Sequence, residues 1–514
     1  MQFPVLSFIV FTPILAGMLI LMLPADRKNE TRAVALAAAV FALLLSLWVY
    51  FNYQAGGPQY QFEEMYTWLP ALGINYHVAV DGISAPLVLL TGIVMFTGVL
   101  ISWGEFDEKL HLSTGIQDRP REFFAFLFIL ASGVFGVFVA QDLFMLFFFY
   151  EIAVFPMYLL ISIWGWVKTR EYAAMKLTLY LFIGSVVSLI GGLAIYFTAG
   201  LGSFDMIRLA QAIQSGALDN TNYLVFGQQV SFQVFWFLPT FLGFAVLGGI
   251  FPFHNWSPDG HVAAPTAVSM FHAGVLMKLG AYAALRVGIM LLPEGAKFWA
   301  PLIMGLALVN IVYGAFIASI QNDFKYVIGF SSVSHMGLVM LGFSTLNSKG
   351  LLGAGMQMFS HGVMTALFFA VVGMIYDRAH TRQINELGGF SRLMPWVSVA
   401  FIIGGLVSMG MPGLSGFAAE FPIFMGVWQV SPWVAIIASI SIVITASYII
   451  RIIGQVFFGS MPKYEHHFND VTAMDKIALV SLCVIMMTIG LYPAIMDRLV
   501  ASGVEHILRL FGGA

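Results

Sequence analysis

Stretches of about 20 apolar residues recur along the whole chain, and this repetition limits the folds it can adopt. A helix of that length crosses the hydrocarbon core of a bilayer, since each residue adds 1.5 Å along the axis. A transmembrane barrel would instead show segments of about 10 residues with alternating polarity. The sequence therefore predicts an all-α polytopic membrane protein. We count 14 spans, at residues 4–24, 33–53, 82–103, 122–140, 142–164, 173–199, 231–251, 263–290, 299–319, 323–344, 353–376, 395–428, 433–457 and 475–495.

The composition agrees with a membrane protein and excludes several other classes. Of the 514 residues, 60% are hydrophobic and 10% are charged, whereas a soluble domain carries about 25% charged residues. The net charge of −3 does not indicate a nucleic-acid partner. Cys483 is the single cysteine, so the chain forms no internal disulfide and ligates no thiolate cluster of its own. The pair His466–His467 lies in a short polar loop and is interpreted as solvated rather than as a metal site.

Two of the spans, the seventh and the twelfth, are interrupted by glycine and proline. In membrane proteins, backbone that leaves the helix at membrane depth is tolerated where it is buried or lines a cavity. Paired interruptions in two halves of a chain indicate an inverted repeat. A short echo, "GFAVL" ending at Leu247 against "GFAAE" ending at Glu420, agrees with a repeat, although these residue types are common in membrane helices. We therefore expect three N-terminal helices (1–121), two inverted five-helix repeats (122–290 and 299–457), and a last helix with a C-terminal interfacial helix (475–514).

The basic residues predict the orientation, because they concentrate on the cytoplasmic side of a membrane protein. Three of them follow the first apolar run, which we therefore expect to be a retained span rather than a signal peptide. With the N-terminus outside, the cytoplasmic side holds 15 of the 23 lysines and arginines: Arg27, Lys28, Arg32, Lys109, Arg119, Arg121, Lys168, Arg170, Lys325, Arg378, Arg382, Arg392, Arg451, Lys463 and Lys476. The outer side holds six: Arg208, Arg286, Lys297, Lys349, Arg498 and Arg509. An even number of crossings places both termini outside, on the periplasmic face of a bacterial inner membrane.

Six ionisable residues fall inside the spans, where each charge costs roughly 2.5–3.5 kcal/mol on insertion scales. They are Glu151, Lys176, Lys278, His335, His361 and Glu420. A structural role, as ion pairs or polar contacts between helices, is the alternative for any one of them. Six in one chain, of which four are lysine or histidine, favour a path for protons.

Five motifs together resemble the antiporter-like subunits of respiratory complex I, above all the M type, and the related antiporter subunits of Mrp type. The resemblance runs from about residue 80 to 455 and also implies a 14-span fold with repeats at spans 4–8 and 9–13. The motifs are "FFFYEIAVFPMYLLISIWG", "FPFHNWSPDGHVAAPTAVSMFHAGVLMKLGAYAALR", "QNDFKYVIGFSSVSHMGLVMLG", "YDRAHTR" and "GMPGLSGFAAEFPIF".

The resemblance implies a role for each buried residue. Glu151 would be the essential span-five glutamate, and Lys278 the span-eight lysine that connects two half-channels. Glu420 would end the second half-channel, where the M type has a glutamate in place of a lysine. The central hydrophilic axis would include His335 and His361, with Lys325 near the cytoplasmic entrance. His254 and Asp259 fall in the motif that follows the span-seven break.

The sequence departs from the family at position 247, where a lysine is usual and this chain has leucine. Glu151 thereby loses its expected partner. Lys176 and His272 are candidate substitutes, and His272 is the more unusual for the family. In a regular α-helix His272 and Lys278 lie about 600° apart and do not share a face.

The implied function is that of a proton-translocating membrane-arm subunit of an NADH:quinone oxidoreductase. This chain would bind no cofactor, and NADH, FMN, iron–sulfur clusters and quinone would belong to other subunits. Its partners would be the lipid bilayer and the other membrane-arm subunits, including sister antiporter-like subunits. The alternatives are an antiporter subunit of Mrp type, the equivalent subunit of a membrane-bound hydrogenase, and a structural subunit that does not pump.

Overall fold

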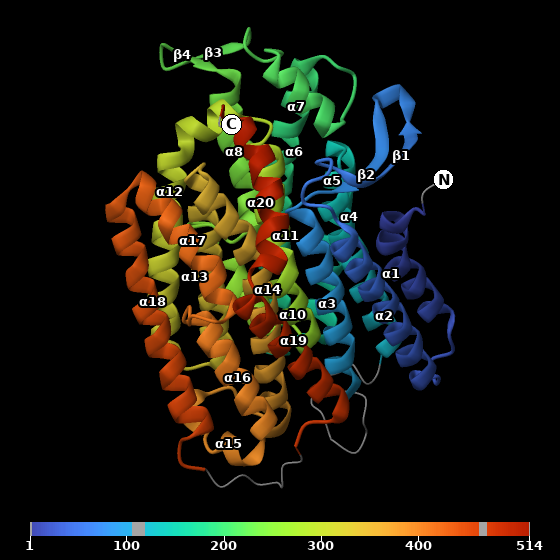
Figure 1. Ribbon diagram of the computed structural model, residues 1–514. Helices are drawn as coiled ribbons and strands as arrows, with labels where there is room; N and C mark the ends of the chain where they lie inside the picture. Colours follow the sequence, from blue (N-terminus) through green and yellow to red (C-terminus); the bar gives the residue numbers. More distant parts are fainter. Residues whose placement is uncertain (1–2, 105–118, 462–469, 513–514) are drawn as a thin grey trace.

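Long apolar helices stand side by side in the structure, a computed structural model that describes residues 3–104, 119–461 and 470–512 (Figure 1). Twelve helical segments within these ranges are long and apolar enough to cross a membrane. Eleven of them are α1 (Val5–Met22), α2 (Lys28–Asn52), α3 (Ser84–Gly104), α4 (Pro120–Val139), α5 (Leu143–Trp164), α6 (Arg170–Ala199), α12 (Pro293–Ile320), α13 (Phe324–Ser344), α14 (Ser348–Ala379), α18 (Pro432–Ile452) with η7 (Ile453–Phe457), and α19 (Ala473–Leu491). The twelfth is the composite span Thr266–Ile289.

The predicted all-α polytopic fold is confirmed, and each of the 14 predicted spans has its helix. Most boundaries agree within a few residues. The largest difference at a helix start is α12, which begins at Pro293 rather than at 299. Proline is favourable at the first helical position, where its missing N–H costs nothing. Lys109, Lys463 and the pair His466–His467 lie outside the described residues.

The two interrupted spans are indeed broken. The seventh consists of α8 (Phe232–Leu247) and α9 (Trp256–Ala263), and the twelfth of α16 (Pro395–Ser408) and α17 (Ser415–Val430). Gly249 takes φ +75° at the first break and Gly410 takes φ +66° at the second. This left-handed backbone strongly favours glycine, so the glycines that marked the interruptions in the sequence also form them.

The span Thr266–Ile289 is not one regular α-helix. It comprises α10 (Thr266–Phe271), the π-helix η4 (His272–Leu276), α11 (Met277–Ala283) and the π-helix η5 (Ala284–Ile289). Short π-helical segments are rare and occur frequently at functional sites. Like α14, this span is buried along all of its apolar stretch, whereas only 33% of that stretch is buried in Pro432–Phe457. The two fully enclosed spans form the centre of the bundle.

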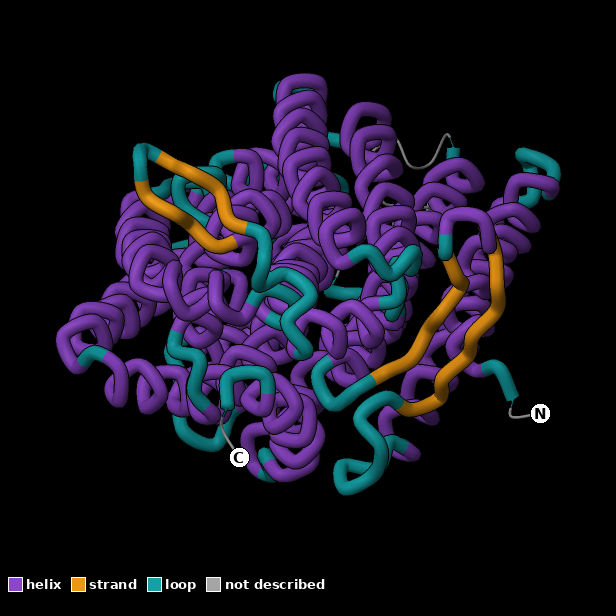
Figure 2. The backbone as a smooth tube through the Cα atoms, turned by 90° about the horizontal axis from the view of Figure 1, so that it is seen from above, coloured by secondary structure: helices purple, strands orange, loops and turns teal. Residues whose placement is uncertain are grey.

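Two β-hairpins, which the all-α prediction did not include, lie at one end of the bundle. They pair β1 (Gln61–Leu69) with β2 (Ile74–Val80) and β3 (Asn222–Val225) with β4 (Gln228–Ser231), both antiparallel. The hairpins lie on opposite sides of this end (Figure 2). Both chain termini and the short helix α7 (Met206–Gln214) are at the same end (Figure 1). The hairpins are short segments between spans, where the helical period of the spans gives no information.

The C-terminal segment forms a helix, α20 (Ala494–Arg509), as expected. Its apolar face is buried, and Gly82 and Gly503 allow close backbone approach between it and the start of α3. The Tyr50 hydroxyl of α2 also donates to the Ile495 carbonyl at 2.8 Å. The helix therefore packs against the bundle and is not an isolated tail.

Candidate functional site

A carboxylate and a histidine meet at the second broken span. Glu420 on α17 lies 3.0 Å from His335 Nδ1 (α13) through its Oε1, and both side chains are at least 94% buried. Gln357 on α14 donates to the same oxygen at 3.1 Å. The other ring nitrogen of His335 is 3.1 Å from the hydroxyl of Ser408, the last residue of α16. Four helices therefore hold one buried proton donor–acceptor pair in place.

His361 continues this cluster toward the centre of the bundle. Its ring centroid is 5.3 Å from that of His335. Neither ring nitrogen has a hydrogen-bond partner among the described residues. His361 also interacts electrostatically with Lys278 and His261. Since buried polar atoms are normally hydrogen-bonded, this unpartnered imidazole is available to accept a proton.

Lys278 is fully buried on α11. Its Nζ donates to the Ala273 carbonyl in η4 at 2.5 Å. The sequence argument for separate faces assumed a regular α-helix between His272 and Lys278, and that assumption is wrong. In the π-helix each N–H bonds five residues back and each turn holds more residues. The Lys278 amine bonds to the carbonyl of the residue next to His272.

A second pair of imidazoles interacts electrostatically with Lys278. The ring centroids of His261 (α9) and His272 (η4) are 4.1 Å apart, and both side chains are fully buried. His261 Nε2 is 3.0 Å from the Ser257 hydroxyl. Within the described residues, His261 Nδ1 and both nitrogens of His272 have no hydrogen-bond partner. Trp256 stacks on His272 with centroids 5.2 Å apart and fixes its plane.

A cavity of about 290 Å³, lined by both apolar and charged side chains, lies beside Lys325 where α5 ends and α13 begins. The Lys325 amine donates to the Ala264 carbonyl at 2.6 Å, within the segment that follows His261. Arg382 donates to the Val262 carbonyl at 3.0 Å and is paired with Asp323 at 3.2 Å. The cavity borders Lys325, at one end of the row of buried ionisable residues His261, His272, Lys278, His361, His335 and Glu420.

Lys176 and Asp259 form an ion pair between α6 and α9. Their Nζ and Oδ2 atoms are 2.7 Å apart, and the side chains are 20% and 24% exposed. The Tyr326 hydroxyl donates to the other carboxylate oxygen at 2.9 Å. His254, just after the helix break, is buried between Phe251 and Tyr313, and its ring nitrogens have no partner in the part of the chain that the structure describes.

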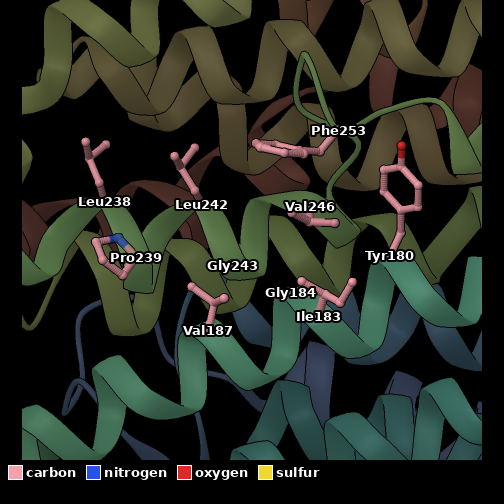
Figure 3. A pocket seen from close by; sticks show the side chains of 10 residues that line it. All are labelled: Tyr180, Ile183, Gly184, Val187, Leu238, Pro239, Leu242, Gly243, Val246 and Phe253. Carbon is pink, nitrogen blue, oxygen red and sulfur yellow. The ribbon is translucent and has the colours of Figure 1, made fainter.

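Glu151 and Leu247 are separate from this row of residues. Glu151 is exposed on α5, and its carboxylate makes no hydrogen bond or ion pair with any described residue. Leu247 is fully buried and packs closely against Gly280 of α11, where any larger residue would overlap its side chain. Beside the break, a groove of about 520 Å³ runs between α6 and α8 and is almost wholly apolar (Figure 3). Its lining comprises Tyr180, Ile183, Gly184, Val187, Leu238, Pro239, Leu242, Gly243, Val246 and Phe253.

Arg286, which the charge distribution assigns to the outer side, lies within a span and is buried in η5. It pairs with Asp81, at the start of α3, at 2.5 Å, and both side chains are at least 97% buried. A buried counter-ion of this kind lets an arginine enter a span. No group of three or more His, Cys, Asp or Glu residues within the described ranges is arranged to hold a metal ion.

Sequence reasoning missed four contributors to the site. His261 stands between the singled-out Asp259 and His272, so its position in the same motif was an available signal. Gln357 and Ser408 are polar residues of common type, and only the fold shows that they meet His335. Arg382 is the last residue of the motif "YDRAHTR", but it was assigned only to a cytoplasmic loop and not to the site.

With this geometry established, comparison with known proteins identifies the family. The model for the transmembrane region of NADH:quinone oxidoreductase and Mrp antiporter subunits matches residues 140–445, more than half of the chain. The chain belongs to this family. The resemblance inferred from the five motifs is thereby confirmed.

Full-length relatives and a solved structure agree with the family. The NAD(P)H-quinone oxidoreductase chain 4 of Gloeobacter violaceus is 33% identical, over 99% of this chain and 93% of the relative. The NADH-quinone oxidoreductase subunit M of Rickettsia conorii is also 33% identical, over 99% of this chain and 100% of the relative. A chain of respiratory complex I from Thermus thermophilus with bound NADH matches with a TM-score of 0.86 at 25% identity, covering 99% of this chain and 100% of that chain.

Proposed function

We propose that this chain is a proton-translocating membrane-arm subunit of a complex I-type NADH:quinone oxidoreductase. The observation that carries the proposal is the row of buried ionisable side chains that begins at the cavity beside Lys325. It continues through His261 and His272 to Lys278, and then through His361 and His335 to Glu420. Charges at this depth are costly and mark ion pathways in membrane proteins. NADH, FMN, iron–sulfur clusters and quinone would be bound by other subunits.

In this proposal each residue holds a proton at a named atom. Lys325 receives protons from the cavity, and the imidazoles of His261 and His272 accept them at unpartnered nitrogens. Lys278 has no carboxylate partner among the described residues, so a nearby charge decides whether its amine is protonated. His361 and His335 pass the proton on to Glu420, whose hydrogen bond from Gln357 orients the accepting oxygen.

Leu247 removes the usual first-half lysine, and we propose that His272, with Lys176 and Asp259, takes over its part. His254 would serve as an auxiliary acceptor beside the break. The substitution His272→Phe keeps the aromatic volume and removes both nitrogens. Proton transport in membrane vesicles should then fall, with assembly unchanged. Unchanged transport would show that His272 is a packing residue.

The orientation and the partners are also part of the proposal. Both termini lie at one end of the bundle (Figure 1), and we propose that this end faces the periplasm of a bacterial inner membrane. Glu151 is exposed on a face rich in exposed apolar side chains, including Phe148 and Phe155. A carboxylate on such a face needs a cationic partner, which fits a sister antiporter-like subunit. The two helix breaks support repeats at 122–290 and 299–457, between the N-terminal segment 1–121 and the last segment 475–514.

The test is purification of the native complex, identification of its subunits, and measurement of NADH-driven proton uptake into vesicles. Lys278→Met removes the central amine and should abolish the contribution of this chain to pumping while NADH oxidation continues with an uncoupler. Undiminished pumping would favour a structural subunit. A complex that lacks NADH oxidation but exchanges Na⁺ for protons would favour the Mrp-type alternative, which the family model includes.

A further inference from the structure

A histidine outside the membrane row joins two parts of the chain at the end that carries the termini. His77 lies on β2 and is 2% exposed. Its Nδ1 is 2.8 Å from Asp205 Oδ2, and its Nε2 is 2.8 Å from Glu63 Oε1. Asp205 is the N-cap of α7, where its other oxygen accepts from the Arg208 backbone N–H. Glu63 lies on β1 and is 53% exposed.

Both hydrogen bonds form at once only if the imidazole is protonated. A carboxylate offers only acceptors, and a neutral imidazole has only one N–H to donate. The protonated ring donates from both nitrogens and carries the opposite charge to both partners. Loss of that proton therefore leaves one nitrogen lone pair directed at a carboxylate.

The surroundings decide which bond is lost. Asp205 is 5% exposed and needs the donor, because an unpaired buried carboxylate is costly. Glu63 is half exposed and can turn to water. Backbone bonds also hold the inner strand independently, since the Gln141 N–H donates to the His77 carbonyl at 2.8 Å. A neutral His77 would thus keep Asp205 and release Glu63.

The start of β1 has an irregular backbone, which favours movement once Glu63 is released. The register between β1 and β2 shifts between Gln61 and Glu64, so Glu63 lies in an irregular part of the ladder. Its neighbour Phe62 has φ +55°, a left-handed conformation that strains a bulky side chain. The bond between Glu63 and His77 holds the residues before Glu64, whereas Glu64 itself is anchored separately, because it accepts hydrogen bonds from the backbone N–H groups of Leu6 and Ser7 and from the Ser7 hydroxyl. The exposed side chains of Met65, Tyr66 and Trp68 follow directly on the same strand.

We propose that His77 is a proton-operated latch that fastens residues 61–63, at the start of the outer strand β1, to the bundle in its protonated state and releases that segment in its neutral state. This latch does not depend on the proposed proton path, because it requires only that the hairpin meet water. Under the proposed orientation it would lie on the side to which protons are delivered.

The charged groups around His77 agree with a latch that closes in acid. Burial lowers the pKa of His77, but hydrogen bonds and charges from Asp205 and Glu63 outweigh it and leave the pKa raised. Burial raises the pKa of Asp205, but hydrogen bonds from His77 and from the backbone N–H groups of α7 have the larger effect. The pKa of Asp205 is therefore lowered. Asp142, at the start of α5, adds a negative charge that acts on Asp205, and Tyr60 also interacts with Asp205.

The pH window follows from these directions. A raised pKa means that the latch is complete below the ordinary histidine value of about 6.5 and is lost as the pH rises through the folded-state pKa. On the acid side, Asp205 is protonated only below its lowered pKa, under the ordinary value of about 3.9. The latch is therefore closed in mild acid and opens in alkali.

Amide hydrogen exchange of the full-length chain in lipid nanodiscs tests the latch between pH 6 and 9. After the intrinsic pH dependence of exchange is divided out, the protection of residues 61–63 should fall roughly tenfold as His77 deprotonates, as expected for one charge-assisted hydrogen bond. The β3–β4 hairpin at the same end provides an internal control and should show no such fall.

Two variants and one control variant make the result decisive. Glu63→Gln can pair with either form of the imidazole, so protection should become independent of pH, and the half-exposed position does not threaten folding. His77→Gln should also remove the dependence, whereas His506→Gln, on α20, should retain it. Wild-type protection that is constant with pH, or an E63Q variant with the full wild-type fall, would overturn the latch.

Discussion

The two broken spans use the same backbone device but surround it with different chemistry. In the second, the break after α16 faces Glu420, His335, Gln357 and Ser408 in one hydrogen-bonded cluster. In the first, α8 ends at Leu247, which is fully buried against α11. The break itself is therefore not what requires a charge. A broken helix supplies space and turned backbone, and the residues that line it decide whether protons can use it.

The first break satisfies its backbone without any ionisable group. The Trp256 indole donates to the Val246 carbonyl at 2.9 Å, and the Asn310 amide donates to the Gly249 carbonyl at 3.1 Å. Carbonyls that a helix break releases must find donors inside the membrane. The ionisable groups of this half lie elsewhere: Asp259 and His261 on α9, Lys176 on α6, and His272 and Lys278 in the composite span. In the first half the ionisable groups therefore lie away from the helix break, whereas in the second half they lie directly at it.

Restoring the usual lysine should break the first half. In Leu247→Lys a charge would enter a fully buried site that is packed against glycine, with an apolar groove beside it. An uncompensated buried charge costs about 3–5 kcal/mol, so the thermal unfolding temperature in detergent should fall sharply. Leu247→Met is the matched control and should cost under about 1.5 kcal/mol. A stable, pumping L247K variant would show that the site still accommodates a lysine.

Removing the carboxylate should disable the second half without unfolding it. Glu420→Gln keeps the shape and the contact with Gln357 but cannot accept and release a proton. A positioned acid–base group typically contributes 10²–10⁴-fold, so proton transfer through this chain should slow by roughly 100-fold. Transport would be measured in vesicles, with uncoupled NADH oxidation as the control for assembly. Equal transport in the variant and the wild type would contradict the role of Glu420.

The Ser408 hydroxyl offers a smaller test of the same cluster. Ser408→Ala removes the partner of His335 Nε2 and leaves the Glu420 contact in place. The loss of one hydrogen bond should cost about 1 kcal/mol of unfolding free energy, and the pH profile of transport should shift without a loss of maximal rate. Ser439→Ala, an exposed serine on α18, is the control. An unshifted pH profile would mean that the hydroxyl does not orient the imidazole.

The sequence was sufficient for the helices because a bilayer imposes one length and one polarity on each span. The breaks could also be predicted, since Gly249 and Gly410 mark them directly. Contacts between spans could not be predicted, because they depend on how helices rotate about their axes. The π-helix at His272 changed that rotation within one span, and nothing in "FHAGVLMK" announces it. The pairing of Arg286 with Asp81 likewise joins residues about 200 positions apart.

The ion pair between Lys176 and Asp259 should show the smallest effect on stability and separates two accounts of the first half. Both side chains are partly exposed, and such pairs contribute about 0–1 kcal/mol. Lys176→Gln should therefore leave the unfolding temperature nearly unchanged, with Asp259 still bound by Tyr326. If Lys176 supplies the cation that Leu247 cannot, proton transport in vesicles should nevertheless fall several-fold, whereas Lys168→Gln at the same end should transport normally. A K176Q variant with full transport would mean that the first half relies on its histidines and not on Lys176. The two halves would then differ both in the type of ionisable side chain and in its position relative to the helix break.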